Sequence, residues 1–550
     1  MTVRRRRLVA SVTLAGAVVF GATLANLPAT ARASAQTSER GAGRGDGDAL
    51  TEVYRAPRRG PGGAPAFLDA TSDLGLLEPL TGMRVHATAT GDVNDDGWSD
   101  LFVGTFADRP EDDYRVRGAD GPSPDRLLLG GSRGFRVDES FPAEWGRTAA
   151  AAFADLDGDG DLDLVLARNV RDVERGRAPS TILRNDRGRF VKAAELDHPR
   201  GARAIGLIDF DGDSRLDLVI VEDRFSDGAS VLWRNEGKLR FVDATRTAGL
   251  PPDVAGMGVA TADLNGDRAP DVLISGSNRL FLNQGDGSFR EDDTARQTFD
   301  WPRFGDEDDP AGVVATDVDG DARTDLVIGQ HYNSTVDEGR RVPVRLYLND
   351  GNDGAQAPRF RDVTGAAGLT PLPTKAPHVD VVDLDADGRL DILTTASAGS
   401  VAVVFRQVGV DEGVPRFELT GIPNPPDYWV TAAVLDADRD GRLDVFLAEF
   451  EPTRPSPLLR NRTNAGHWFG VTATPGTVVE LFHAGGLGDP HDRLAWREVG
   501  TSTGFAAGPS VTAWFGLGAV HRIDVRIVSP EGRTVVELHD AGVDRLVRLP

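Results

Sequence analysis

Short apolar runs alternate with acidic stretches along most of the 550-residue chain. Seven of these runs directly follow an aspartate-rich segment: LFVGTF, LVLARN, LVIVED, VLISGS, LVIGQH, ILTTAS and VFLAEF. A run of this length, nearly continuous and rich in branched side chains, predicts a strand that is buried on both faces. We therefore expect these seven strands at the inside of a stack of sheets.

Most of the apolar runs are followed by a second strand signal and a turn. Examples are TILRNDRGRF from Thr181, SVLWRNEGKLRF from Ser230 and RLFLNQGDGSF from Arg279. We expect the Asn, Asp and Gly residues of these turns to supply the positive φ that tight hairpins need. Each repeat is thus predicted to form an up-and-down antiparallel sheet.

The acidic stretches share the pattern D-x-[DN]-x-D-x-x-x-D, and we number them loop 1 to loop 7. They start at Asp92, Asp155, Asp209, Asp263, Asp317, Asp383 and Asp436, with separations of 63, 54, 54, 54, 66 and 53 residues. A period near 54 residues with about four short strands per repeat suits a β-propeller, which typically has about four to eight blades. Seven loops therefore predict seven blades.

A phenylalanine opens the strand before each loop, at Phe67, Phe135, Phe190, Phe241, Phe289, Phe360 and Phe417. The first marker precedes loop 1, whereas no good copy follows loop 7 before the sequence changes near residue 462. We therefore predict that the segment from Phe67 to Thr71 completes the last blade, a closure that removes a free sheet edge.

The loops offer oxygen ligands at regular positions. Side chains at positions 1, 3 and 5, a backbone carbonyl at position 7 and a carboxylate at position 9 are expected to converge on one point. Hard oxygen donors of this number suit Ca²⁺, and the first half matches the calcium signature of the EF-hand, although a strand follows instead of a helix. The predicted metal ligands are Asp92, Asn94, Asp96, Trp98, Asp100, Asp155, Asp157, Asp159, Asp161, Asp163, Asp209, Asp211, Asp213, Arg215, Asp217, Asp263, Asn265, Asp267, Ala269, Asp271, Asp317, Asp319, Asp321, Arg323, Asp325, Asp383, Asp385, Asp387, Arg389, Asp391, Asp436, Asp438, Asp440, Arg442 and Asp444.

The alternative is that Asp-Gly-rich hairpins merely punctuate the strands, which is common for a single loop. Seven complete ligand sets in register argue against it. Position 6 is glycine in four loops but Ser214, Arg268 and Ala322 in loops 3, 4 and 5. A non-glycine residue takes up a sharp turn at some cost, so we expect these three sites to be looser.

The formal net charge is −24, and much of the negative charge lies in these loops. Up to seven Ca²⁺, one per blade, would offset about half of the net negative charge that the chain has once the signal peptide is removed. Nucleic acid is an unsuitable partner for such a surface. The chain contains no cysteine, which excludes disulfides and a lipid-modified cysteine tether.

The N-terminus carries Arg4 to Arg7, then an apolar run from Leu8 to Leu27, then small residues typical of a cleavage site. We interpret residues 1–33 as a signal peptide, exported by the Sec or the Tat route. An uncleaved membrane anchor is the alternative. Residues 34–63 are rich in Gly, Arg and Asp, and are predicted to be a flexible linker.

Residues 64–462 resemble FG-GAP or VCBS repeat proteins, the calcium-loop propellers of integrin α-chains and many secreted bacterial proteins. Residues 463–550 look like the ASPIC/UnbV domain of the cartilage acidic protein-like family, on Trp468, Gly516, Leu517, Gly518 and the VSPEGR turn. The resulting expectation is an all-β chain: a seven-bladed calcium-loop propeller followed by a small C-terminal β-sandwich.

Three functions are compatible with this organisation. The first is a secreted or cell-surface scaffold, monomeric and not inserted in a membrane, that binds an extracellular protein or glycan through the longer segments 107–126 and 331–358. The second is an accessory protein of enediyne-type biosynthesis that binds or acts on a small aromatic molecule. The third is a calcium-dependent carbohydrate-active enzyme, for which the chain offers no convincing catalytic signature: His331 and His378 sit beside predicted strands and are expected to be structural.

Overall fold

The computed structural model describes residues 50–549 except 57–64, 108–109, 117, 144, 170–178, 197–200, 225–227, 302–307, 332–343, 353–356, 373–376, 396–403, 423–427 and 502–503. The predicted signal peptide lies outside the described residues. Residues 48–550 form one compact unit, and all the features below belong to it.

The described residues form nine four-stranded sheets, and seven of them correspond to the repeats. We refer to these seven as blades 1 to 7, each named after its loop. Their strands are, in blade 1, β3 (Val85–Gly91), β4 (Asp100–Thr105), β5 (Arg126–Leu129) and β6 (Arg136–Val137); in blade 2, β7 (Thr148–Ala154), β8 (Asp163–Arg168), β9 (Ser180–Asp186) and β10 (Arg189–Leu196); in blade 3, β11 (Ala202–Ile208), β12 (Asp217–Glu222), β13 (Val231–Asn235) and β14 (Phe241–Asp243); in blade 4, β15 (Gly258–Ala262), β16 (Asp271–Ser275), β17 (Arg279–Asn283) and β18 (Phe289–Asp292); in blade 5, β19 (Asp309–Thr316), β20 (Asp325–His331), β21 (Arg345–Asn352) and β22 (Pro358–Asp362); in blade 6, β23 (Val379–Val382), β24 (Asp391–Thr394), β25 (Val404–Asp411) and β26 (Val414–Thr420); and in blade 7, β27 (Trp429–Leu435), β28 (Asp444–Glu449), β29 (Leu458–Asn461) and β2 (Phe67–Asp69).

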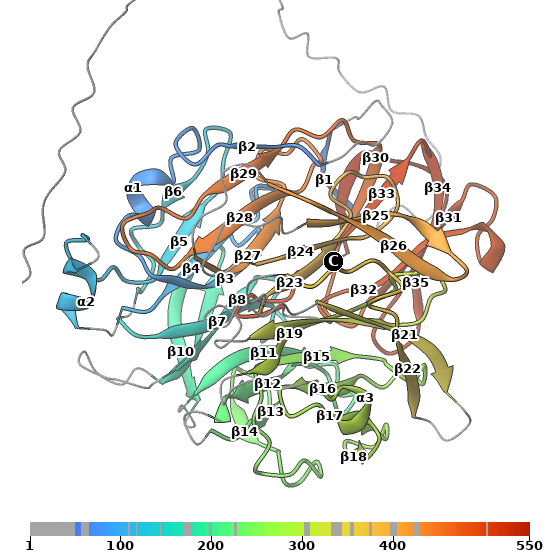
Figure 1. Ribbon diagram of the computed structural model, residues 1–550, viewed down its shortest axis with the longest axis horizontal. Coiled ribbons are helices and arrows are strands. Elements are labelled where there is room, and N and C mark those ends of the chain that lie inside the picture. The colour runs from blue at the N-terminus through green and yellow to red at the C-terminus, as the bar shows by residue number, and fades with distance from the viewer. Residues whose placement is uncertain are drawn as a thin grey trace, which may run out of the picture. The chain divides into compact units, whose positions relative to one another are not determined.

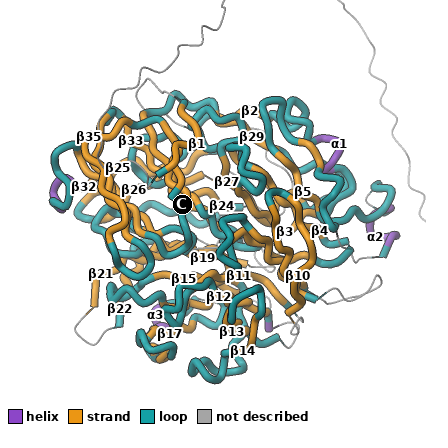
Figure 2. The backbone as a smooth tube through the Cα atoms, turned by 180° about the vertical axis from the view of Figure 1, so that it is seen from behind, coloured by secondary structure: helices purple, strands orange, loops and turns teal. Residues whose placement is uncertain are grey.

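Every blade is antiparallel throughout, as predicted. The first strands of successive blades contact each other in the order β3, β7, β11, β15, β19, β23 and β27, and β27 contacts β3 again. Figures 1 and 2 show these strands gathered around the middle of the ring. The predicted all-β propeller fold is therefore confirmed.

A separate apolar cluster fills each junction between neighbouring blades. The cluster between blades 7 and 1, for example, contains Val85 and Leu101 of blade 1 with Phe446 and Ala448 of blade 7. The second strand is fully buried in six blades, and in blade 5 only its last residue, His331, is half-buried, which agrees with the continuous apolar sequence of these strands. Burial of apolar area between blades is the main force that holds the ring together.

The ring is closed by the N-terminal segment. β2 pairs antiparallel with β29, with Phe67 opposite Asn461, so the predicted closure of the last blade is confirmed. The marker phenylalanines have a different place from the one expected, because they lie at the fourth strand of a blade. The whole first strand of the next blade, such as β3 after Phe67, stands between each marker and the following loop.

The remaining two sheets form the C-terminal sandwich. One contains β1 (Thr51–Arg55), β36 (Arg545–Arg548), β30 (His467–Thr472) and β33 (Thr512–Gly518); the other contains β32 (Arg493–Glu498), β31 (Val478–His483), β34 (Arg522–Val528) and β35 (Thr534–Gly542). A common apolar core joins them, including Phe469, Leu481 and Val525. The predicted flexible linker over 34–63 is wrong at residues 51–55, because Thr-Glu-Val-Tyr-Arg forms β1 and pairs with β36.

The segment between β32 and β33 enters the centre of the ring. The amide of Gly508 donates to the carbonyl of Thr88 in blade 1 (2.9 Å), and the amide of Thr261 in blade 4 donates to the carbonyl of Thr501 (3.0 Å). The side chain of Phe505 is 1% exposed, and it belongs to a cluster with Phe106, Phe450 and other residues from the middle of the ring. We call residues 501 and 504–510 the plug, since they contact blades on several sides at once.

Helices are short in the described part of the chain: α1 (Leu77–Leu80), α2 (Glu111–Arg115), α3 (Ala295–Thr298) and the 3-10 helix η2 (Pro490–Asp492). Within the described residues, no helix has the length and apolar character needed to cross a membrane.

Candidate metal centres in the aspartate loops

All seven aspartate loops connect the first strand of a blade to its second strand. The aspartate at position 9 is the first residue of the second strand in every blade, as at Asp100 in β4 and Asp163 in β8. Each loop therefore ends directly in a buried strand, which fixes the position-9 carboxylate.

The same five hydrogen bonds organise each of the seven loops. The position-1 carboxylate accepts the amides of positions 5 and 6. The position-5 carboxylate accepts the amide of position 7. The position-9 carboxylate accepts the amide of position 2 and that of a residue at or directly after the third strand. The repeated sequence thus produces one repeated loop conformation.

Two residues of each loop have positive φ. Position 6 does so in all seven loops, including Ser214 (65°), Arg268 (72°) and Ala322 (65°), and so does position 4, including Ala386 (53°) and Arg439 (56°). Every loop except loop 2, which has Gly158 and Gly160, therefore carries one non-glycine residue in the left-handed region. Loops 1, 6 and 7 bear the same backbone strain at position 4, so strain alone does not set loops 3, 4 and 5 apart. Looser metal sites in loops 3, 4 and 5 stay a prediction.

Five of the loops bring three carboxylates together. In loops 2, 3, 5, 6 and 7, one ligand oxygen from each of positions 1, 3 and 9 lies within 4.8 Å of the other two. The five clusters are Asp155, Asp157 and Asp163; Asp209, Asp211 and Asp217; Asp317, Asp319 and Asp325; Asp383, Asp385 and Asp391; and Asp436, Asp438 and Asp444. Each of these clusters can hold a metal ion.

The position-3 carboxylate supplies the test of whether a cation fits. In loops 2, 3, 6 and 7 one oxygen of this group is buried and has no hydrogen-bond partner: Oδ1 of Asp157, Asp211, Asp385 and Asp438. A buried charged oxygen without a partner costs about 1–3 kcal/mol or more. In loops 6 and 7 the other oxygen of this carboxylate pairs with Arg406 or Arg460. The atom left unpaired in all four repeats is a place where a cation fits.

Burial raises the pKa of the clustered carboxyl groups. The pKa of Asp163 is raised to about 7, that of Asp217 to about 8 and that of Asp319 to about 6, with burial as the largest cause in each case. Neighbouring aspartates of the same loop raise these pKa values further. A bound cation would oppose both effects, since it stabilises the ionised form.

The position-5 carboxylate, which the sequence predicts as a metal ligand, pairs with an arginine in four loops. In loops 3, 5, 6 and 7 its carboxylate forms an ion pair with the arginine at position 7, as Asp213 does with Arg215. That arginine also donates to the carbonyl of a residue in the third strand, as Arg442 does to Asn461 (2.5 Å). The clusters found among the described residues contain positions 1, 3 and 9 only. Position 5 organises the loop through these bonds.

Loops 1 and 4 carry Asn at position 3 and so bring fewer carboxylates together. The Oδ1 of Asn94 accepts the amide of Asp96 (3.1 Å), and that of Asn265 accepts the amide of Asp267 (3.0 Å). The side-chain amide of Asn265 also donates to Asp267 (2.9 Å). The side-chain oxygens of both asparagines therefore have a hydrogen-bond donor within the loop.

In five blades, an asparagine near the end of the third strand links the blade to the loop of the preceding blade. The Nδ2 atom of Asn235, for example, donates to the carbonyl of Leu156 in loop 2 (2.8 Å). The equivalent bonds join Asn185 to Val93, Asn283 to Phe210, Asn349 to Leu264 and Asn461 to Leu384, at 2.7–3.0 Å. The sequence interpretation gave these asparagines a turn role through positive φ, yet none of the five has it. The sequence signal for this link between blades was the asparagine that recurs near the end of the third strand.

The C-terminal sandwich packs against several of the loops. The amide of Gly518 donates to the carbonyl of Ala386 in loop 6 (2.9 Å), and the hydroxyl of Tyr54 donates to Asp436 of loop 7. A Cβ atom at Gly516 would lie 1.9 Å from Oδ2 of Asp383, and one at Gly441 would lie 2.1 Å from Nε1 of Trp468. Residues that carry the C-terminal resemblance, Trp468, Gly516 and Gly518, thus lie at this interface.

The plug fixes the role of His378. The amide of Phe505 donates to Nδ1 of His378 (3.1 Å), so the other ring nitrogen carries the proton and donates to Oδ2 of Asp380 (2.8 Å). The hydroxyl of Thr431 donates to the carbonyl of Phe505 (2.5 Å). His378 is fully buried and hydrogen-bonded on both nitrogens, which agrees with the structural role expected for it.

The fold and its loops define the class: a β-propeller with seven repeated aspartate loops, five of which hold carboxylate clusters that could take a metal ion. The model of the FG-GAP-like repeat matches residues 209–274 and 383–447. Cartilage acidic protein 1 of Mus musculus is 26% identical over 424 residues, which cover 71% of this chain and 62% of that protein. The Homo sapiens protein is 26% identical over 424 residues, with coverages of 71% and 61%. The chain thus carries FG-GAP-like repeats and is similar to cartilage acidic protein 1, and it spans about 62% of the length of the Mus musculus protein.

Solved structures with a similar arrangement are distant in sequence. An Agrocybe aegerita lectin that recognises non-reducing terminal N-acetylglucosamine is 16% identical, with a TM-score of 0.35 and coverages of 62% of this chain and 88% of the lectin. The V. cholerae biofilm matrix protein Bap1 is 13% identical, with a TM-score of 0.30 and coverages of 85% and 74%.

Proposed function

We propose that this protein is an exported, calcium-stabilised β-propeller that acts as a scaffold for binding an extracellular protein or glycan. The observation that carries the calcium part is the set of buried, unpartnered oxygens at position 3 of four loops. Asp and Asn oxygens are the donors that Ca²⁺ prefers, and the loops present no sulfur or imidazole for zinc.

The proposed role of the ions is to hold the first and second strands of each blade together. Positions 1 and 9 flank the turn between these strands, and their like charges repel without a cation. A divalent ion in a cluster would turn this repulsion into a link. Five such links around the ring would stabilise the whole propeller.

The proposed ligand-binding surface is the end of the ring opposite the loops. The sandwich packs against loops 6 and 7 and so covers part of the loop end. The second strand of each blade begins at its loop, so the connection that follows it, such as the segment with α2 after β4, lies at the opposite end. The predicted specificity segment 107–126 belongs to this end, whereas much of 331–358 lies outside the described residues.

Export and an extracellular location are part of the proposal. The Arg-rich, apolar N-terminus supports export, and the similarity to cartilage acidic protein 1 is compatible with it. We propose a binding role rather than a catalytic one. In its support, His378, which like His86 is a buried histidine at the centre of the ring, has hydrogen-bond partners on both of its nitrogens.

Calcium binding is tested with the mature chain stripped of metal. Titration with CaCl₂ in a calorimeter should give binding at several sites, and the melting temperature should rise by several degrees. Asp211→Asn and Asp385→Asn should each remove about one site, whereas Asp73→Asn, at an exposed aspartate outside the loops, should remove none. Absence of binding to the native chain, with an unchanged melting temperature, would refute calcium stabilisation.

The scaffold role is tested on the calcium-loaded protein with a panel of glycans, matrix-type proteins and small aromatic molecules. Stabilisation by a glycan or a protein, lost after chelation, is the expected result. Stabilisation by an aromatic molecule alone would instead favour the accessory role in natural-product biosynthesis, and turnover of a glycan would favour an enzyme.

A further inference from the structure

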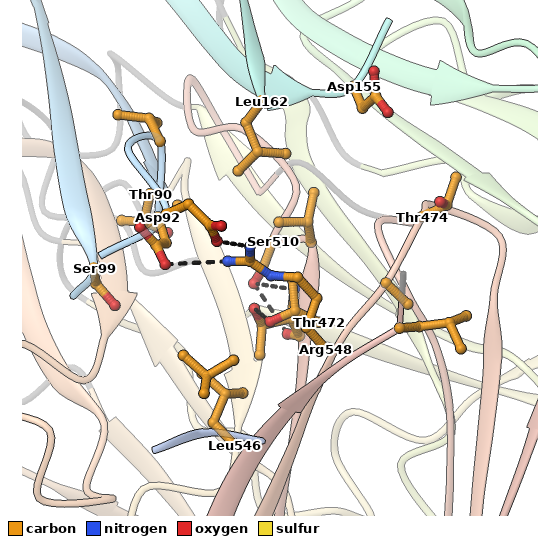
Figure 3. Close-up of a pocket in the computed structure, with 18 of the residues that line it drawn as sticks. Thr90, Asp92, Ser99, Asp155, Leu162, Thr472, Thr474, Ser510, Leu546 and Arg548 are labelled. Atoms are coloured by element: carbon orange, nitrogen blue, oxygen red, sulfur yellow. Dashed lines mark hydrogen bonds and ion pairs between the residues drawn. The ribbon is translucent and has the colours of Figure 1, made fainter. Parts of the chain in front are cut away.

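Arg548 of the C-terminal sandwich reaches loop 1 of the propeller. It lies in β36, next to Thr51 of β1 and Thr472 of β30. Its Nη2 atom donates to Oδ2 of Asp92 (3.1 Å), and its Nη1 atom donates to Oδ1 of Asp95. Figure 3 shows the guanidinium of Arg548 beside the carboxylate of Asp92. Both residues line a pocket of about 230 Å³ between the two domains.

The two acidic partners of Arg548 belong to loop 1 itself. Asp92 occupies position 1, which in five other loops is a member of a carboxylate cluster. Asp95 occupies position 4, where the other loops have Gly, Ala or Arg: Gly158, Gly212, Gly266, Gly320, Ala386 and Arg439. An aspartate at position 4 is therefore particular to loop 1.

Loop 1 lacks the carboxylate at position 3 and has one at position 4 instead. Position 3 is Asn94, whose Oδ1 is satisfied by the amide of Asp96, so the buried unpaired oxygen seen at position 3 of four other loops has no counterpart here. The carboxylate appears one residue later, at Asp95, which has φ of 59° and is 70% exposed. It thus lies toward Arg548 and away from the point where positions 1, 3 and 9 meet in the other loops.

A guanidinium suits this arrangement. Its planar set of donors bridges two separated carboxylates, whereas a metal ion needs several oxygens that converge on one point. A cation bound by Asp92, Asn94 and Asp100 would also repel the guanidinium that contacts the same Asp92 carboxylate. Arginines also pair with Oδ2 of Asp385 in loop 6 (2.7 Å) and Oδ2 of Asp438 in loop 7 (3.2 Å), but Oδ1 of each stays buried and without a hydrogen-bond partner. Loop 1 has no such spare carboxylate oxygen at position 3, so arginine and metal compete for it.

Loop 4 separates the effect of asparagine from that of Arg548. It also has Asn at position 3, but Gly266 follows at position 4. The carboxylate of its position-1 residue, Asp263, accepts the amides of Gly266, Asp267 and Arg268. Asparagine at position 3 therefore does not by itself explain the aspartate at position 4 of loop 1, Asp95. The contact of Asp95 with Arg548 does explain it.

We propose that loop 1 is a guanidinium-binding site, in which Arg548 takes the place of the metal ion and anchors the C-terminal sandwich on blade 1. The inference rests on the proposed calcium function, because it concerns which of the loops take calcium. The anchor joins residues 456 positions apart in the chain, and it is independent of calcium.

The inference is tested by the calcium content of the full mature chain after equilibrium dialysis against calcium, measured by elemental analysis. Arg548→Met should bind one more Ca²⁺ per chain than the native protein, and adding Asp92→Asn should remove this gain. Arg545→Met, on the same strand β36, should leave the calcium content unchanged. No gain in Arg548→Met, or loss of one ion when Asp92→Asn is made alone, overturns the inference.

Failure of the proposed calcium function gives a different result. A native chain without calcium in any loop refutes that function, while a single ion gained by Arg548→Met would still support competition at loop 1. Absence of calcium from both proteins refutes both proposals.

A second measurement uses the native Arg548 and so does not depend on the folding of a variant at that position. In an anomalous difference map from crystals of the native chain grown in calcium, no ion peak should lie beside Asp92 or Asp100. A peak at these carboxylates would place metal in loop 1 and overturn the inference.

Discussion

The side-chain amide of Asn283 donates a hydrogen bond of 3.0 Å to the main-chain carbonyl of Phe210, which belongs to the neighbouring blade. The same amide donates to the carbonyl of Pro270 in its own blade (3.2 Å), and its oxygen accepts the amide of Gly285 (2.9 Å). One buried side chain thus ties two loops and a hairpin together.

Asn283→Ala should lower the free energy of unfolding by about 2–3 kcal/mol, because it leaves buried carbonyl groups without a donor. Urea denaturation of the calcium-loaded protein measures the change. Gln284→Ala, at the exposed neighbour, should cost less than about 0.5 kcal/mol. Equal effects of the two substitutions would show that the link between blades contributes little.

Ala322→Gly should stabilise the protein by up to about 1 kcal/mol. Ala322 has φ of 65°, and the strain of a Cβ atom there outweighs the extra chain entropy that glycine loses on folding. Gly320→Ala, at the other left-handed position of the same loop, should destabilise by a similar amount. Chemical denaturation with and without calcium distinguishes this effect of the loop backbone from a change in metal binding. Destabilisation by Ala322→Gly in both conditions would contradict the account.

Phe505→Ala should destabilise the protein by about 3–5 kcal/mol, since it removes a fully buried ring from the plug. It should also loosen the contact between propeller and sandwich, because the backbone of Phe505 is bound by His378 and Thr431. Hydrogen exchange of the amides in β3 and β23 reports this loosening. Leu419→Ala, at a side chain 41% exposed on β26, is the control. Unchanged exchange in Phe505→Ala would show that the plug does not hold the domains together.

Glu449 makes stability depend on pH. Burial raises its pKa from 4.5 to about 7. The folded state then binds a proton that the unfolded state has released, so the stabilisation is fully present below pH 4.5 and is lost as pH rises through 7. The shift corresponds to roughly 3 kcal/mol.

Glu449→Gln should therefore unfold with a weaker pH dependence between pH 5 and 8 than the native protein, and should be more stable at pH 8. The comparison is made by thermal unfolding in excess calcium, which holds the loop carboxylates in one state. Glu418→Gln, on the exposed side of β26, should keep the native dependence. Parallel pH curves for the native protein and Glu449→Gln would contradict the assigned pKa.

The sequence predicted the features that repeat along the chain. The aspartate loops, the buried second strands and the closure by Phe67 follow from local patterns, because a strand or a loop is encoded within about ten neighbouring residues. The backbone strain at position 4 is equally local, because Ala386 and Arg439 stand where most other loops have glycine. The expectation from the sequence concerned position 6 alone.

Contacts between distant parts of the chain were not predictable in this way. Arg548 lies on β36, and nothing near it in sequence indicates Asp92 as its partner. Phe505 reaches His378 over 127 residues, and Tyr54 reaches Asp436 over 382. β1 was assigned to a linker because its neighbours are rich in glycine and charge, while its pairing partner stands at the other end of the chain. Such pairs depend on how the two domains meet, which a local pattern does not encode.

The position-3 oxygens provide the most direct test of the metal account. An anomalous difference map from crystals grown in calcium, recorded at a long wavelength, locates each bound ion. The account predicts peaks beside Asp157, Asp211, Asp319, Asp385 and Asp438. A map without a peak at any of these carboxylates would contradict it.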